Sequence, residues 1–339
     1  MIVNTYAVLA LLLASLEALL GAIVVVGAVR AARASRGEAG RGPSDAATSG
    51  LFLASVALLG LAVVSWPLLY LLLDSYASQW QGVMCIEGVA RIGSHAGGVA
   101  SLLPFLAHGL EATKPLVLLA AGAWLLLHLA NRRTRTAPLS GRVVAVLGVA
   151  AALAIVDAAT QAAYVLIPKD APALARGCCT ASEGGGAALL DSVHPDATAL
   201  TVLFVASAVL MAAWAWRAAR ATGGFVASRS GTVVLLLACA PALALGLAFL
   251  REVASPAFLG RPGHHCVYCM LASTPLGGLA LGLLALGAFA VAWACLLRRL
   301  GDDGETRPFV PARVASLLLW GSFGWLGAVV LTSVQLATA

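Results

Sequence analysis

Long apolar runs, separated by short polar connections, dominate the chain and predict its secondary structure. Eight of them reach the roughly 20 residues that an α-helix needs to cross a hydrocarbon core of about 30 Å. They lie at about 5–29, 51–73, 112–131, 143–167, 198–217, 231–250, 270–297 and 313–336. Because lipid offers no hydrogen bonds to the backbone, runs of this length can cross it only as helices. The pattern therefore predicts an all-α, polytopic integral membrane protein with about eight transmembrane helices.

Composition agrees with this prediction and excludes a water-soluble enzyme. Hydrophobic residues make up 61% of the chain and charged residues only 11%, whereas soluble domains carry about 25% charged residues. The net charge of +6 does not indicate a nucleic-acid partner, because the arginines form short patches between the apolar runs. The sequence has no Walker loop, dinucleotide-binding glycine motif or HExxH helix, which disfavours ATP-driven transport and hydrolase chemistry.

The distribution of cationic residues predicts the orientation in the membrane. Of the 21 lysines and arginines, 15 fall in the four connections that follow odd-numbered runs. The positive-inside rule makes these connections cytoplasmic, so both termini are expected outside. The first run has no basic segment before it and arginines after it, which favours a retained helix over a signal peptide. We expect a bacterial inner-membrane protein in contact with the lipid bilayer.

The outer connections at 74–111, 168–197 and 251–269 carry five of the seven cysteines. Cys85, Cys178, Cys179, Cys266 and Cys269 thus face the side on which disulfides form and persist. We interpret residues 1–339 as a single membrane domain. Twice, a run containing a proline leads to an outer cysteine, which suggests a repeat of two four-helix halves with a break near 168–197.

The sharpest local motif is Gly263-His264-His265-Cys266-Val267-Tyr268-Cys269-Met270, which leads into the seventh run. Cysteines three apart on a helix share a face, where they can form a disulfide or bind one soft metal ion. In the first turn of a long helix, the exposed N–H groups and the dipole also favour a thiolate. The motif predicts a reactive pair, with Cys266 as the attacking thiol and Cys269 as the resolving one. The alternative is an inert structural pair.

The Cys-x-Tyr-Cys motif, followed by Met270-Leu271-Ala272-Ser273, resembles the active-site helix of bacterial vitamin K epoxide reductase homologues over about 30 residues. The resemblance implies that Cys266 and Cys269 exchange electrons with a lipid quinone held in a helix bundle. It also implies that a loop cysteine pair passes electrons to a periplasmic thiol protein. The family core has four or five spans, against eight predicted here, and its loop pair has no match in this chain.

The remaining outer cysteines have two interpretations. A disulfide between the adjacent Cys178 and Cys179 requires a strained ring, so one of them is expected to bond to Cys85 or to relay electrons to Cys266. The alternative is a structural bridge from Cys85 to one of the pair.

A metal site is a second interpretation of the same motif. Imidazole groups at His264 and His265 stand beside the thiols of Cys266 and Cys269, and this mixture of ligands suits Cu(I) or Zn(II). The protein would then bind or transfer a thiophilic metal. A third interpretation is a non-catalytic assembly subunit whose cysteines are only structural.

Three polar residues inside the runs are further candidates. Glu17 lies near the middle of the first run, and Asp157 and Gln161 lie one helical turn apart in the fourth. An ionisable group at this depth costs about 2.5–3.5 kcal/mol on insertion scales, so it usually faces a bundle interior or a water path. We expect these residues either to carry protons or cations or to form buried hydrogen bonds between helices.

Overall fold

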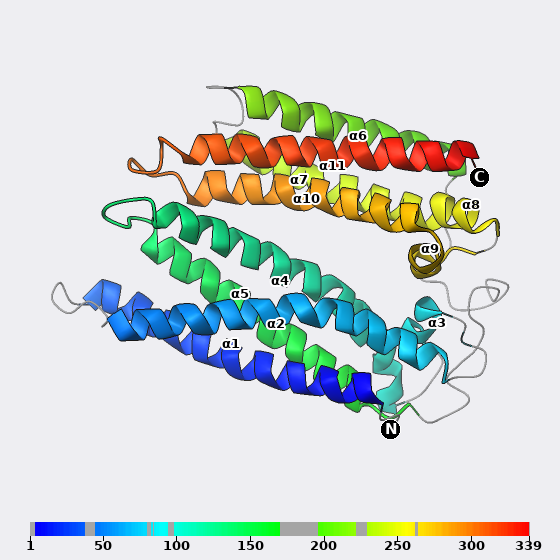
Figure 1. The fold of residues 1–339 in the computed structure, drawn as a ribbon, viewed down its shortest axis with the longest axis horizontal. Helices are drawn as coiled ribbons and strands as arrows, with labels where there is room; N and C mark the ends of the chain where they lie inside the picture. The colour runs from blue at the N-terminus through cyan, green and yellow to red at the C-terminus, as the bar shows by residue number, and fades with distance from the viewer. Residues whose placement is uncertain are drawn as a thin grey trace. The chain divides into compact units, whose positions relative to one another are not determined.

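The computed structural model describes residues 4–37, 45–79, 83, 85–93, 98–169, 196–221, 229–261 and 264–338. Their regular elements are helices, and no strand occurs among them (Figure 1). Eight of the helices are long and apolar enough to cross a membrane. The prediction of an all-α, multi-pass membrane protein is confirmed.

The eight long helices follow the predicted runs closely. They are α1 (Thr5–Gly37), α2 (Asp45–Ala77), α4 (Leu103–Asn131), α5 (Ser140–Leu166), α6 (Ala197–Arg220), α7 (Arg229–Phe249), α10 (Pro275–Leu300) and α11 (Val310–Thr338). The largest difference is in α4, which begins at Leu103 instead of about 112. His108, Glu111 and Lys114 lower the mean hydropathy of its first half, so an apolar window misses a segment that is helical nonetheless.

The chain divides into two compact units, Met1–Cys178 and Cys179–Ala339, here called unit 1 and unit 2. Each contains four of the long helices. In unit 1, α1 and α4 each pack against both α2 and α5; in unit 2, α6 and α10 each pack against both α7 and α11. Each unit is therefore a closed ring of four helices with its own core.

The two units share further features in the same order. The second long helix of each contains a proline, Pro67 in α2 and Pro241 in α7. Before the third long helix comes a short one whose N-cap residue is a cysteine: α3 (Ile86–Ala90) after Cys85 and α9 (Val267–Ser273) after Cys266. These parallels favour an internal repeat, which stays a prediction.

The outer surfaces of the long helices are apolar, as contact with lipid requires. Leu53 on α2 and Leu210 on α6 expose 69% and 68% of their surface. Small residues fill much of the interior, among them Ala10, Ala154 and Ala208, which are fully buried. Helices in membranes commonly approach each other closely at such residues because there is no hydrophobic drive between them.

The closest such approach predicts a stability effect in unit 2. A Cβ at Gly324 of α11 would lie 2.4 Å from the backbone N of Gly287 on α10, whereas a Cβ at Gly282 would meet nothing within 4 Å. We expect Gly324→Ala to destabilise unit 2 by about 1–3 kcal/mol through overpacking. Gly282→Ala, the control, should leave the thermal unfolding of detergent-solubilised protein unchanged or raise its midpoint. Equal midpoints for the two variants would contradict the close packing.

Candidate functional site

The paired cysteines lie at the start of α9, a separate helix of 7 residues: Cys266 is its N-cap residue and Cys269 lies in its first turn. The prediction that they open a long transmembrane helix is wrong: Thr274 is extended, with φ −129° and ψ 109°, and α10 begins at Pro275. Proline supplies no N–H to the helical ladder and disfavours helical geometry in the residue before it. The dipole of a long helix therefore does not act on the thiols.

The two thiols are close together. The sulfur atoms of Cys266 and Cys269 lie within 4.8 Å of each other, and the backbone N–H of Cys269 donates a hydrogen bond to Sγ of Cys266 at 3.4 Å. Cys266 is buried, with 1% of its surface exposed, while Cys269 is half-buried. The pair can close into a disulfide, or it can hold one soft ion, since two sulfurs about 2.3 Å from a zinc ion are at most about 4.6 Å apart.

Two segments that precede α9 in the chain hold it in place. The helix α7 continues through a π-helical turn, η4 (Leu250–Ala254), into α8 (Ser255–Leu259), and α8 packs against α9. The Ser255 hydroxyl on α8 lies 3.7 Å from Sδ of Met270, which is fully buried one residue after Cys269. This contact fixes the base of α9 and so the position of the two thiols.

One histidine of the motif, His265, pairs with a carboxylate. Nδ1 of His265 lies 3.1 Å from a carboxylate oxygen of Glu252 on η4. In the part of the chain that the structure describes, no imidazole nitrogen lies within 4.8 Å of both sulfur atoms. Desolvation, followed by the charges of Arg261 and His265, lowers the pKa of His264 from its ordinary value, so this imidazole is neutral at pH 7. The four ligands of the predicted metal site are therefore not assembled around one point.

The structure describes one of the other three predicted cysteines. Cys85, in unit 1, is buried and is the N-cap residue of α3, although its side chain makes no capping hydrogen bond. Cys178 and Cys179 lie outside the described residues. Their roles as relay or structural partners stay predictions.

Unit 1 contains a buried polar cluster inside the membrane-spanning region. Its centre is the ammonium group of Lys114 on α4, which donates to Asp157 at 2.8 Å, to Ser65 at 3.0 Å and to Gln161 at 3.1 Å. The hydroxyl of Thr113 donates to the second carboxylate oxygen of Asp157. Asp157 and Lys114 expose only 2% and 3% of their surfaces. The three protons of the ammonium group and both carboxylate oxygens of Asp157 are thus engaged.

The structure brings together the three intramembrane residues that the sequence indicated. Gln161 also donates to the backbone carbonyl of Ala10 on α1 at 2.9 Å, and Glu17 on α1 interacts electrostatically with Lys114 and Asp157. The central residue, Lys114, was missed. The sequence held one signal for it, since only 2 of the 21 cationic residues are lysines. However, Lys114 lies at the very start of the predicted run at 112–131, where a charged residue is unremarkable.

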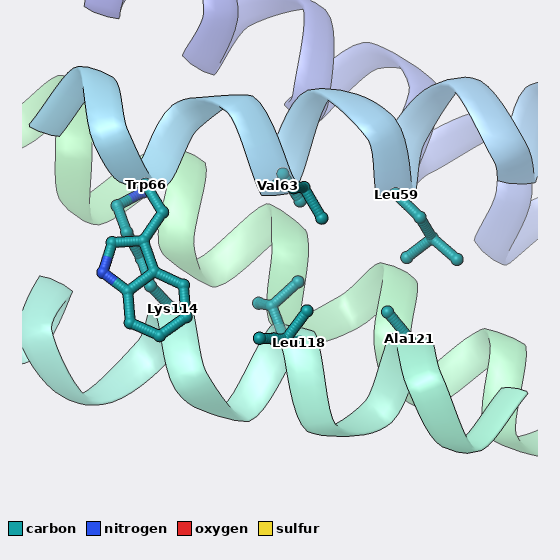
Figure 2. Close-up of a pocket in the computed structure, with 8 residues that line it drawn as sticks. Leu59, Val63, Trp66, Lys114, Leu118 and Ala121 are labelled. Carbon is teal, nitrogen blue, oxygen red and sulfur yellow. The ribbon is translucent and has the colours of Figure 1, made fainter. Parts of the chain in front are cut away.

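A small pocket lies beside this cluster, between α2 and α4. Leu59, Val63 and Trp66 line it from α2, and Lys114, Leu118 and Ala121 line it from α4 (Figure 2). Because Lys114 already makes three hydrogen bonds within the cluster, it offers no spare donor to a polar ligand in the pocket.

No protein-family model, curated protein or solved structure matches this chain. Its fold and its candidate site together define the class: a multi-pass membrane protein of two four-helix units, with a closely spaced thiol pair on a short helix of unit 2. What it does has to follow from its own residues.

Proposed function

We propose that the protein is a membrane thiol–disulfide oxidoreductase in which Cys266 and Cys269 alternate between dithiol and disulfide. The observation that carries this is the approach of the two sulfurs to within 4.8 Å on one short helix. The sulfurs of a disulfide are about 2.0 Å apart. Small rotations of the two side chains can close the remaining distance.

The proposed reaction transfers two electrons and two protons. A thiolate of a partner dithiol attacks Sγ of Cys269 in the disulfide, the Cys266–Cys269 bond breaks, and Cys266 leaves as a thiolate. The second thiol of the partner then attacks the mixed disulfide and releases Cys269, so the partner is oxidised and the pair reduced. A lipid quinone takes the two electrons and two protons from the pair, which restores the disulfide and yields the quinol.

The surroundings of the two sulfurs favour this order of attack. Cys269 is the more exposed thiol, so it is the one that a partner reaches. The hydrogen bond from its backbone N–H to Sγ of Cys266 stabilises a thiolate there, as a donor does for any developing negative charge. This order is the reverse of the one suggested by the motif alone.

The positions of the arginines support an outward-facing site. In unit 1 the α4–α5 turn carries Arg132 and Arg133, at the end of α4 opposite to α3. In unit 2, Arg298 and Arg299 lie in the last turn of α10, at the end opposite to α9. By the positive-inside rule the arginine ends are cytoplasmic. We place the protein in a bacterial inner membrane, with α9 on the periplasmic side and a periplasmic thiol protein as its partner.

Quinone reduction by the purified protein tests the proposal. The reduced protein in lipid nanodiscs, mixed without oxygen with a short-chain ubiquinone analogue, should form one quinol and one Cys266–Cys269 disulfide per chain. The Cys266→Ser, Cys269→Ser double variant should form neither. A matched control replaces Cys239 and Cys295, which are buried within α7 and α10, and should react like the wild type. A wild-type protein inert towards quinone, or a reactive Cys266/Cys269 variant, would rule the proposal out.

Binding of a thiophilic metal is the second candidate function. The same sulfur separation, within 4.8 Å, fits two ligands on one Zn(II) or Cu(I) ion. Stoichiometric metal uptake by the reduced protein, lost in the double variant and accompanied by no quinone reduction, would favour this function over the first.

A further inference from the structure

Glu17 has an unusual environment for a carboxyl group. It lies midway along α1, and none of its surface is exposed. Neither of its carboxyl oxygens has a hydrogen-bond partner among the residues that the structure describes. An ionised carboxylate without hydrogen bonds in such surroundings is strongly disfavoured, because nothing replaces the water it has lost.

Burial has the largest effect on which form Glu17 takes, and the charges around it modify that effect. The charged groups that act on it are Lys114, on α4, and Asp157, on α5. The Ser65 hydroxyl on α2 is also near, but it donates to the backbone carbonyl of Ala62 at 3.0 Å and so is not free to donate to Glu17. Lys114 and Asp157 neutralise each other through their 2.8 Å ion pair. The cluster is therefore electrically neutral with Glu17 protonated, and it carries one net negative charge with Glu17 ionised.

A single bound cation would neutralise the negative charge that the cluster carries when Glu17 is ionised. A proton fits this position better than a metal ion. A metal cation would need several oxygen ligands around it, but both oxygens of Asp157 already accept hydrogen bonds from Lys114 and Thr113. The position between those oxygens and Ser65 is occupied by the Lys114 ammonium group. A proton needs no coordination shell and adds directly to a carboxyl oxygen.

We propose that Glu17 is a proton-binding site, which holds a proton in the resting protein and can release and rebind it inside unit 1. Lys114 makes release possible, because its positive charge favours the ionised form of Glu17. The ion pair with Asp157 limits this effect, so the proton is retained until the surroundings become more alkaline or the pair rearranges. The site is independent of the thiol pair, which belongs to unit 2.

Infrared spectroscopy of the protein in nanodiscs tests this site, because a protonated carboxyl has a C=O stretch distinct from that of a carboxylate. The wild type should show one such band at neutral pH that disappears as the pH rises. The band should be missing in Glu17→Gln and retained in the control Asp302→Asn, which changes an exposed carboxyl.

A second measurement needs no variant and so does not depend on how Glu17→Gln folds. Dicyclohexylcarbodiimide, an apolar reagent, modifies protonated carboxyl groups within membranes. Mass spectrometry of the labelled wild type should find the adduct on Glu17, with a yield that falls over the pH range in which the infrared band disappears. A band that Glu17→Gln does not remove, or one that stays constant at every pH at which the protein remains folded, would overturn the proposal.

Discussion

Lys114→Met should destabilise unit 1 by about 3–5 kcal/mol, because it leaves the buried charge of Asp157 without its counter-ion. Asp157 exposes only 2% of its surface, so water cannot replace the lost ammonium group. Ser65 and Gln161 lose their hydrogen bonds to Nζ in the same step. The free energy of unfolding, measured by titrating folded protein in mixed micelles with a denaturing detergent, gives the effect directly.

Two controls separate this charge effect from a loss of packing. Lys114→Met combined with Asp157→Leu removes both charges and should cost less than Lys114→Met alone, because replacing a whole buried pair is often nearly neutral. Arg91→Met breaks an exposed pair with Glu87 on α3 and should cost less than about 1 kcal/mol. If Lys114→Met were no more costly than Arg91→Met, the cluster would not hold a buried ion pair.

Cys266→Ser and Cys269→Ser should each abolish turnover completely, yet only Cys266→Ser should trap a partner. Without Cys266, the exposed Cys269 still forms mixed disulfides, and no neighbouring thiol is left to resolve them. In Cys269→Ser the remaining thiol is buried and is out of reach of a partner protein. Acid-quenched cells, analysed on non-reducing gels and by mass spectrometry, should therefore show an adduct in the first variant alone.

The trapping experiment also tests the assigned roles of the two thiols. Trapping in Cys269→Ser but not in Cys266→Ser would restore the order that the motif suggested, with Cys266 attacking. A Cys239→Ser variant serves as control, since this thiol is buried in α7 beside the carbonyl of Ala288 and should neither trap a partner nor lose turnover. Absence of any adduct would mean that the pair does not exchange disulfides with proteins.

Local properties of the sequence are enough to predict the long helices. A segment of apolar residues must satisfy its own backbone in lipid, whatever its neighbours are, so hydropathy alone placed eight spans. The break before α10 was also encoded locally, in Pro275, but the continuous apolar pattern concealed it. The early start of α4 was missed for the opposite reason: His108, Glu111 and Lys114 interrupt the hydropathy without interrupting the helix.

Only the tertiary structure decided which polar residues meet. Glu17, Lys114 and Asp157 come from three different helices, and periodicity within one helix does not specify what packs against its polar face. The exposure of Cys269 relative to Cys266 likewise depends on how α9 packs against α8 and α10. The sequence by itself thus determined the membrane-spanning helices and the spacing of the thiols. Packing between helices determined the partner of each buried charge and the thiol open to attack, because both depend on contacts between distant segments.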